Sequence, residues 1–179
     1  LPELLRQICK IDGLKWVRIL YCYPEMITEE LCDTIAKEPK IVKYVDLPIQ
    51  HISDKVLKAM NRHGDSALIK EKIELLRKKV PGIVIRSTVI VGFPGETKED
   101  FALLAEFLKE VKFERLGVFA FSCQEGTPAA KMDDPTPKEE KNRRFDKLCA
   151  VQNSISEQIH KDYIGKTMEC LVDGNDKEF

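Results

Sequence analysis

The stretch Ser87-Thr-Val-Ile-Val-Gly-Phe-Pro-Gly-Glu-Thr97 decides the fold class of this chain. It joins the most apolar run of the sequence, residues 83–91, to a Pro-Gly turn and to the acidic Glu96. Thr97 and Asp100 then have the spacing of a helix N-terminal capping box. The stretch therefore predicts a buried strand, a tight turn and a helix start, as in a parallel βα unit.

Three further strand-like runs alternate with helix-like runs on both sides of this stretch. Strands are predicted at 16–21, 43–49 and 115–121, and helices at 2–10, from Thr28, from Ser53, at 66–79, from Thr97 and at 138–163. The alternation predicts an α/β fold with a parallel sheet, and the unbroken apolar runs predict strands covered on both faces. Because a closed eight-stranded barrel needs roughly 200 residues or more, we expect parallel βα repeats that form part of a TIM-like barrel.

The end of the chain differs from the βα repeats. Residues 165–176 have strand character and then an Asp-Gly turn signal. We therefore expect a barrel portion at 1–163 and the first strand of a truncated β domain at 164–179. We also expect the chain to be a piece of a longer protein.

Composition excludes several classes of protein. The chain is 43% hydrophobic and 33% charged, which argues against disorder. Its formal net charge is −1, so no overall electrostatic attraction to nucleic acid or to a membrane surface is expected. No apolar run approaches a membrane span and no signal-like start is visible, so a cytoplasmic location is expected. The six cysteines show no Cys-x-x-Cys spacing, so most are expected to be buried thiols.

The residues that follow the strands are the candidates for chemistry, because sites of parallel βα folds lie at the carboxyl ends of strands. Gly95 does not fit a phosphate loop, because Glu96 follows where a Lys would be required. Gly92 fits either a plain turn or the close approach of a flat ligand. Gln50 can form a hydrogen bond either with a hydroxyl-bearing ligand or with the loop that follows it. A single histidine such as His51 is more often structural than catalytic.

Arg86 lies inside the apolar strand, on the face that alternation also gives to Thr88, Ile90 and Gly92. A charged group there needs a partner, which is either an anionic ligand or a core carboxylate such as Asp46. The charge-mixed residues 138–144 favour a solvated helix face over an RNA-binding patch.

Three segments together resemble the radical S-adenosylmethionine (SAM) methylthiotransferases. They are residues 47–62 (LPIQHISDKVLKAMNR), 85–101 (IRSTVIVGFPGETKEDF) and 121–132 (FSCQEGTPAAKM). Residues 165–174 (GKTMECLVDG) resemble the start of that family's C-terminal TRAM domain. The resemblance implies a radical SAM barrel and the transfer of a methylthio group to an unactivated carbon.

Two subfamilies share this pattern: one modifies an aspartate of a small-subunit ribosomal protein and the other an adenosine of tRNA. Residues 50–53 (QHIS) and 124–128 (QEGTP) differ from the QSGS and RPGTP that are usual in the tRNA enzymes. The resemblance therefore favours the ribosomal-protein aspartate subfamily. The tRNA enzymes, and a cluster-free scaffold or binding module of the same fold, stay as alternatives, and only the tRNA reading makes nucleic acid a partner.

The resemblance also implies cofactors and residues that bind them. These are SAM and two [4Fe–4S] clusters, with an external reductant and a sulfur source. The expected SAM contacts are Gln50, Arg86, Thr88, Val91, Gly92, Phe93, Phe119 and Phe121. Arg86 is expected on the cofactor's carboxylate, Gln50 on its ribose or amino-acid part and Gly92 beside its adenine, while Glu96 organises the turn.

The chain departs from the family pattern at the cluster ligands. The family's Cys-x-x-x-Cys-x-x-Cys loop is absent, and the six cysteines do not offer its spacing. We therefore expect the cluster ligands to lie outside this chain and the chain alone to be inactive. No residue of the chain is expected to be catalytic or to bind metal.

Overall fold

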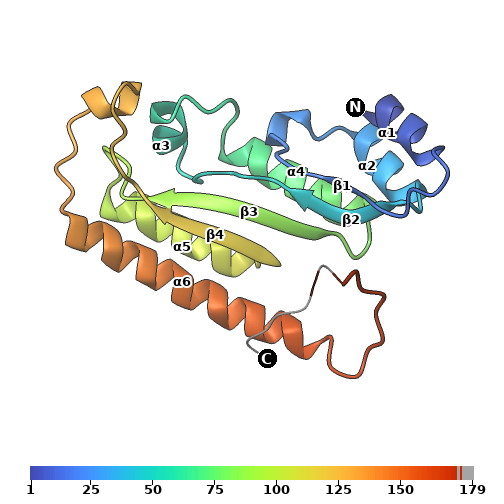
Figure 1. Cartoon of the computed structure of the whole chain (residues 1–179). Coiled ribbons are helices and arrows are strands. Elements are labelled where there is room, and N and C mark those ends of the chain that lie inside the picture. The colour runs from blue at the N-terminus through green and yellow to red at the C-terminus, as the bar shows by residue number, and fades with distance from the viewer. Residues whose placement is uncertain (173, 175–179) are drawn as a thin grey trace.

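The computed structural model describes residues 1–172 and 174, and its centre is a four-stranded parallel sheet with strand order β1-β2-β3-β4 (Figure 1). The strands are β1 (Val17–Ile19), β2 (Ile41–Asp46), β3 (Val84–Val91) and β4 (Arg115–Ala120). The α-helices are α1 (Pro2–Cys9), α2 (Glu29–Lys37), α3 (Asp54–Ala59), α4 (Ser66–Lys79), α5 (Lys98–Val111) and α6 (Lys138–Lys161). Two short 3₁₀ helices are η1 (Pro24–Met26) and η2 (Pro128–Lys131). The predicted alternation of strands and helices is confirmed.

Helix starts follow from local capping chemistry. The Thr28 hydroxyl accepts a hydrogen bond from the Leu31 N–H at 3.2 Å, and Thr97 with Asp100 forms the predicted capping box. Ser53 precedes α3, but its hydroxyl donates to Asp100 Oδ1 at 2.6 Å and does not cap the helix. The predicted helix start at Ser53 is confirmed, since Ser53 is the N-cap residue of α3, but its side chain makes no capping hydrogen bond.

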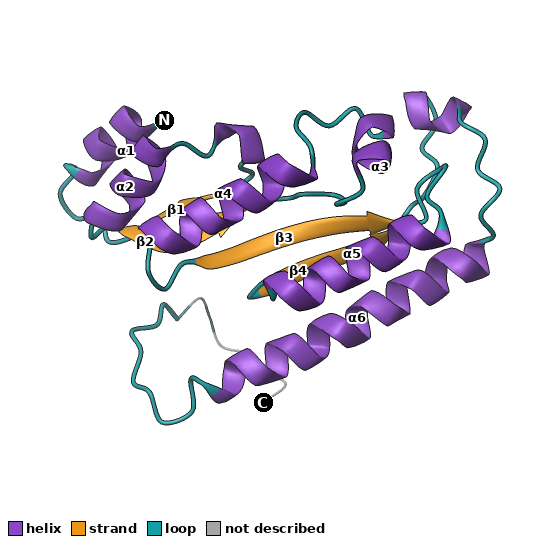
Figure 2. Cartoon of the chain, turned by 180° about the vertical axis from the view of Figure 1, so that it is seen from behind, coloured by secondary structure: helices purple, strands orange, loops and turns teal. Residues whose placement is uncertain are grey.

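Burial along β3 alternates strictly, so only one face of this strand is covered. Ile85, Ser87, Val89 and Val91 are buried, whereas Val84, Arg86, Thr88 and Ile90 are partly exposed. Helices α4 and α5 lie over the first face (Figure 2), and the second face is the inner face of the curved sheet. The expectation of strands covered on both faces is wrong for β3, because four strands do not close around the inner face.

The hydrophobic core lies between the sheet and the helices on its outer face. Its fully buried members include Ile85 and Val89 of β3, Leu76 of α4 and Leu104 of α5. Burying each of these side chains contributes roughly 1.5–3 kcal/mol. This layer fixes the strands whose carboxyl ends carry the site described below.

The segment after α6 has no regular secondary structure at residues 166–172. The predicted strand of a second domain falls in the range 164–179, and residues 173 and 175–179 lie outside the described residues. The division into 1–163 and 164–179 therefore stays a prediction. Among the helices that the structure describes, none is long and apolar enough to cross a membrane.

Candidate functional site

A pocket of about 470 Å³ opens at the carboxyl ends of the central strands. One wall is the turn after α3, with Met60, Asn61 and Arg62, and the opposite wall is the segment of η2. Gln50 and the β3 residue Ile90 line the same pocket. Arg62 and Gln50 also line a second pocket of about 200 Å³, beside Tyr21 and Tyr23. The two pockets meet at Gln50 and Arg62, so this edge of the sheet is the candidate site.

Gln50 is held in the sheet although it lies beyond the end of β2. Its N–H donates to the Thr88 carbonyl and its carbonyl accepts from the Ile90 N–H, both at 2.8 Å. Its backbone takes a left-handed conformation with φ of +67°, which is uncommon for a residue other than glycine. Its side-chain Oε1 is buried and has no hydrogen-bond partner among the described residues. A pocket-lining residue with a strained backbone and an unpaired buried acceptor is typical of a ligand-binding position.

The turn after β3 is built around the carboxylate of Glu96, which is fully buried. It accepts hydrogen bonds from the N–H groups of Gly92 and Phe93 and pairs with the buried Arg144 at 2.8 Å. Burial raises the pKa of the Glu96 carboxyl, while the Arg144 guanidinium and the two N–H donors oppose the rise. Glu96 therefore organises the turn and does not face the pocket.

The charged start of α6 is packed against this turn. Lys141 and Arg144 are buried, and Lys141 Nζ pairs with Asp134 and lies 5.0 Å from the centre of the Phe121 ring. The prediction of a solvated helix face at 138–144 is wrong for these two residues. Arg144 pairs with Glu96 before α5, and Lys141 pairs with Asp134 in the segment before α6, so the pattern within the helix could not show that they are buried.

Gly92 has a positive φ of +71°, and the space where a Cβ would lie is filled by Lys141. A Cβ there would be 2.4 Å from Lys141 Cγ. Packing within the chain thus requires that Gly92 has no side chain. This favours the alternative in which Gly92 serves a plain turn. Close approach of an adenine to Gly92 stays a prediction.

Replacing Gly92 by valine is expected to lower the free energy of unfolding by about 1–3 kcal/mol, because a β-branched residue is strained at this φ and displaces Lys141. Urea unfolding measures the change. Gly126→Val, at a φ of +81° with nothing within 4 Å of its Cβ position, is the matched control for backbone strain alone. Equal losses in the two variants would show that the contact with Lys141 contributes nothing.

Arg86 contacts Asp46, the core carboxylate that was one of its two expected partners. Its Nη1 lies 3.1 Å from Asp46 Oδ2, and the Asp46 side chain is only 1% exposed. The Arg86 side chain is 43% exposed on the inner face, and Asp46 Oδ1 has no partner among the described residues. Asp46 thus orients the guanidinium, while part of the Arg86 side chain still faces the open inner face.

The other expected contact residues divide between two faces of the sheet. Thr88 and Phe119 share the inner face, since a Cβ at Gly117 would lie 3.6 Å from Thr88 Oγ1 and 3.4 Å from the Phe119 ring. Phe119 is 56% exposed there, although it is a large apolar side chain. Val91 points to the opposite face and is fully buried in the core. Only the main chain of Val91 remains at the site, where its carbonyl accepts from the Phe121 N–H at 2.8 Å.

Phe93 and Phe121 pack edge to face above the end of β3, with ring centres 5.1 Å apart. Phe93 lines the larger pocket and is mostly buried. The pair joins the turn after β3 to the segment after β4. The pair thereby holds the ring of Phe93, which lines the pocket, against the segment after β4.

His51 is fully buried, as expected for a histidine with a structural role. Its Nδ1 accepts a hydrogen bond from the Ser53 N–H at 2.9 Å, and its Nε2 has no partner among the described residues. Burial lowers the pKa of His51 to about 4, with Arg144 lowering it further and Asp100 opposing. The imidazole is therefore neutral at neutral pH.

The cysteines do not form a metal site in the part of the chain that the structure describes. No group of three or more His, Cys, Asp or Glu side chains there is placed to hold a metal ion. Cys9, Cys22 and Cys32 are buried, and burial raises the pKa of each thiol. Cys149 is partly buried and Cys123 and Cys170 are exposed, so the expectation of buried thiols is confirmed for three of the six cysteines.

Comparison with known proteins decides the family. The family model described as "Radical SAM superfamily" matches residues 1–108. The chain belongs to the radical SAM superfamily. Its curated relatives include proteins named ribosomal protein uS12 methylthiotransferase RimO. They share 50% identity over 100% of this chain in Clostridium botulinum (strain Eklund 17B / Type B) and 47% over 99% in Anaeromyxobacter sp. (strain Fw109-5). The chain spans 40% and 38% of the length of these two relatives.

Solved structures of radical SAM enzymes share the fold. Coproporphyrinogen III oxidase (HemN) of Escherichia coli superposes with a TM-score of 0.67 at 21% identity, over 86% of this chain and 36% of that one. The radical SAM methyltransferase TsrM of Kitasatospora setae superposes with a TM-score of 0.55 over 66% of this chain and 24% of that one. The parallel sheet described here is thus part of a radical SAM, TIM-like barrel, as the sequence predicted.

The residues at the strand ends fit SAM in part. Gln50 Oε1 and Asp46 Oδ1 are unpaired buried acceptors, which suit the hydroxyl and ammonium donors of that molecule. The exposed ring of Phe119 on the inner face suits a flat base. The described residues do not fit a [4Fe–4S] cluster, because no set of cysteines converges.

Sequence reasoning did not identify Arg62 as part of the site. Arg62 stacks on the Tyr23 ring at 4.6 Å and donates from Nη2 to the Pro48 carbonyl at 2.9 Å. Its place at the end of the family-like segment 47–62 was the available signal. The partners that bring it to the pocket, Tyr23 and Pro48, follow two other strand ends.

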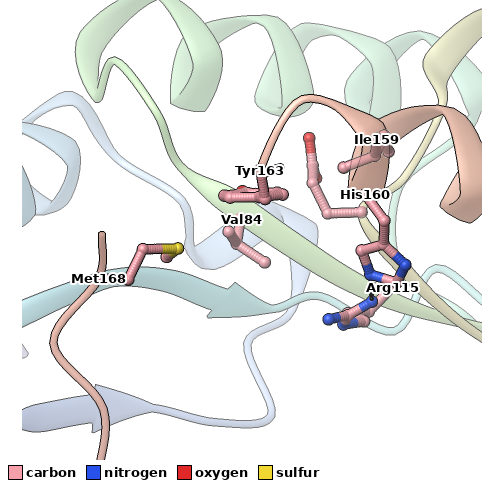
Figure 3. A pocket seen from close by; sticks show the side chains of 7 residues that line it. Val84, Arg115, Ile159, His160, Tyr163 and Met168 are labelled. Atoms are coloured by element: carbon pink, nitrogen blue, oxygen red, sulfur yellow. Dashed lines mark hydrogen bonds between the residues drawn. The ribbon is translucent and has the colours of Figure 1, made fainter. Parts of the chain in front are cut away.

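A further cavity of about 460 Å³ lies at the opposite end of the sheet (Figure 3). Val84 and Arg115, the first residues of β3 and β4, line it together with Tyr163 and Met168. The Arg115 guanidinium is 2.8 Å from His160 Nε2. Because sites of barrels of this kind lie at the carboxyl ends of strands, this cavity is separate from the candidate site.

Proposed function

We propose that this chain is part of a radical SAM methylthiotransferase, which attaches a methylthio group to the β-carbon of an aspartate in a small-subunit ribosomal protein, uS12. The observation that carries the proposal is the similarity to proteins named uS12 methylthiotransferase, at 47–50% identity over 99–100% of this chain. The substitution of QHIS for QSGS at 50–53 agrees with this subfamily.

In the proposed reaction, the residues of this chain bind and orient SAM. SAM, when bound, supplies the hydrogen-abstracting chemistry that an unactivated carbon needs. Arg86, oriented by Asp46, binds the cofactor's carboxylate, and Gln50 accepts a hydrogen bond from its ribose or amino-acid part. Thr88, Phe93, Phe119, Phe121 and the main chain at Val91 and Gly92 surround its adenosyl part.

The remainder of the activity requires parts that the described residues do not provide. Two [4Fe–4S] clusters, a reductant and a sulfur source belong to the proposed whole protein, with cluster ligands outside this chain. Residues 1–163 form the barrel portion and 164–179 begin a TRAM domain in this proposal. A modifier of ribosomal proteins is placed in the cytoplasm, where those proteins are made.

The test of the proposal is to identify which substrate gains a methylthio group. The full-length protein, reconstituted anaerobically with iron and sulfide, is incubated with SAM, a reductant and either uS12 or bulk tRNA. Mass spectrometry is expected to find the group on an aspartate of uS12. Modification of tRNA alone would overturn the choice of substrate, and absence of product on both would overturn the reaction.

Arg86→Ala in the reconstituted full-length protein is expected to weaken SAM binding by about 1.5–3 kcal/mol, roughly 10- to 100-fold in Kd, because a charge-assisted contact is lost. Isothermal titration calorimetry measures the Kd. Arg77→Ala, which removes another carboxylate-paired arginine (3.6 Å from Glu114) at the other end of the sheet, is the control. An unchanged Kd for Arg86→Ala would remove Arg86 from the cofactor site.

A further inference from the structure

Arg62 is a cation at the pocket mouth that has no carboxylate within 4.0 Å among the residues that the structure describes. The two other arginines near the site are neutralised, Arg86 by Asp46 and Arg144 by Glu96. A partly buried guanidinium without an acidic partner is the feature that an anionic ligand group completes.

The guanidinium of Arg62 is fixed in place before any ligand arrives. Its planar group lies over the Tyr23 ring at 4.6 Å, and Nη2 donates to the Pro48 carbonyl at 2.9 Å. One of its five N–H donors is used by that carbonyl, so a pair of donors remains for a planar anion such as a carboxylate. An orientation fixed by stacking reduces the entropy lost when a ligand binds.

Arg62 lies beside residues that are assigned to the cofactor, because Gln50 and Phe93 line the same pocket. Arg62 lines the pocket on the wall of the α3–α4 turn. Ile90 lines the same pocket, and its side chain shares the inner face with Thr88 and Arg86. A carboxylate bound to Arg62 therefore lies beside the cofactor surface.

We propose that Arg62 binds the carboxylate of the substrate aspartate and so places its β-carbon beside the cofactor surface. This inference rests on the proposed function, because the aspartate substrate comes from it. The β-carbon of an aspartate is bonded directly to the carboxyl carbon, so holding the carboxylate limits where that carbon lies. Arg62 is thereby a substrate-binding residue for the acidic side chain.

The test uses the full-length protein and uS12, with Arg62→Gln and Arg62→Lys as variants. Binding of uS12 is measured by fluorescence anisotropy without SAM, and KM and kcat are measured with the reconstituted enzyme. Arg62→Gln is expected to raise the Kd and the KM for uS12 about 10- to 100-fold, as the loss of a charged hydrogen bond implies. Arg62→Lys, which keeps the charge but not the planar fork, is expected to lose less.

Arg18 provides the matched control, because it also stacks on a tyrosine, with its guanidinium 4.7 Å from the Tyr44 ring centre, but lines none of the pockets at the strand ends. Arg18→Gln is expected to leave uS12 binding unchanged. Thermal unfolding of both variants shows whether Arg62→Gln acts only through the loss of its stacking and of the bond to Pro48.

A second substrate makes the assignment specific. With a uS12 variant that carries Asn at the modified position, Arg62→Gln is expected to bind as well as the wild-type enzyme, since no carboxylate is lost. An equal loss with both substrates would overturn the proposal. So would an increased SAM Kd with unchanged uS12 binding, which would assign Arg62 to the cofactor. If the wild-type enzyme leaves uS12 unmodified and fails to bind it, the proposed function fails, and this inference fails with it.

Discussion

Glu96→Ala is expected to lower the free energy of unfolding by about 3–5 kcal/mol, the cost of leaving a buried charge without its partner. The variant removes the carboxylate that Arg144 contacts at 2.8 Å, and it also leaves the N–H groups of Gly92 and Phe93 without an acceptor. Glu140 still contacts Arg144 Nε at 2.9 Å, which sets the lower end of the range. Urea unfolding measures the loss.

Glu106→Ala on α5 is the matched control for Glu96→Ala. Glu106 pairs with Lys109 at 2.7 Å, but both side chains are more than half exposed, so the loss is expected to be less than about 1 kcal/mol. Similar losses in the two variants would mean that the buried pair with Arg144 does not stabilise the turn after β3.

The stability of the protein is expected to fall by roughly 3 kcal/mol between about pH 6.5 and pH 4 because of His51. The pKa of His51 is lowered from 6.5 to about 4 in the folded protein, so in this range the unfolded chain binds a proton that the folded chain does not. The contribution of His51 is therefore fully present above its unfolded pKa and is lost as the pH falls toward 4.

His51→Asn isolates this contribution, because other groups titrate nearby. Burial raises the pKa of Glu96, which opposes the His51 slope just above pH 4.5, and the pKa of Asp100 is lowered, which acts below pH 3.8. The difference in free energy of unfolding between the wild type and His51→Asn is expected to shrink as the pH falls from 6.5. A difference that is constant with pH would show that the folded protein protonates His51 normally.

The strands and helices were predictable because their signals are local. The apolar run 83–91, the capping pair Thr97 and Asp100, and the basic last turn of α4 before Pro81 each depend on neighbouring residues. Alternation along β3 also predicted correctly that Arg86, Thr88 and Ile90 share a face. The same reasoning offered Asp46 as the partner of Arg86, and the structure shows that contact.

The parts of the site that the sequence did not predict depend on long-range contacts. Arg144 and Glu96 are 48 positions apart, and Lys141 fills the space beside Gly92 from another element. The charged residues at the start of α6 have the same pattern as those of a solvent-exposed helix. No local pattern therefore distinguishes a buried charged helix start from an exposed one. Arg62 was missed for the same reason, since its environment is set by Tyr23 and Pro48.

The two backbone hydrogen bonds of Gln50 to Thr88 and Ile90 give this position the rigidity of a strand, although it lies in a connecting segment. Where a loop that lines a ligand site has to become ordered on binding, the ordering costs part of the affinity. Here that cost has already been met during folding, in the left-handed backbone of Gln50. Substitutions that loosen this bridge are therefore expected to weaken ligand binding through entropy, without removing any group that touches the ligand.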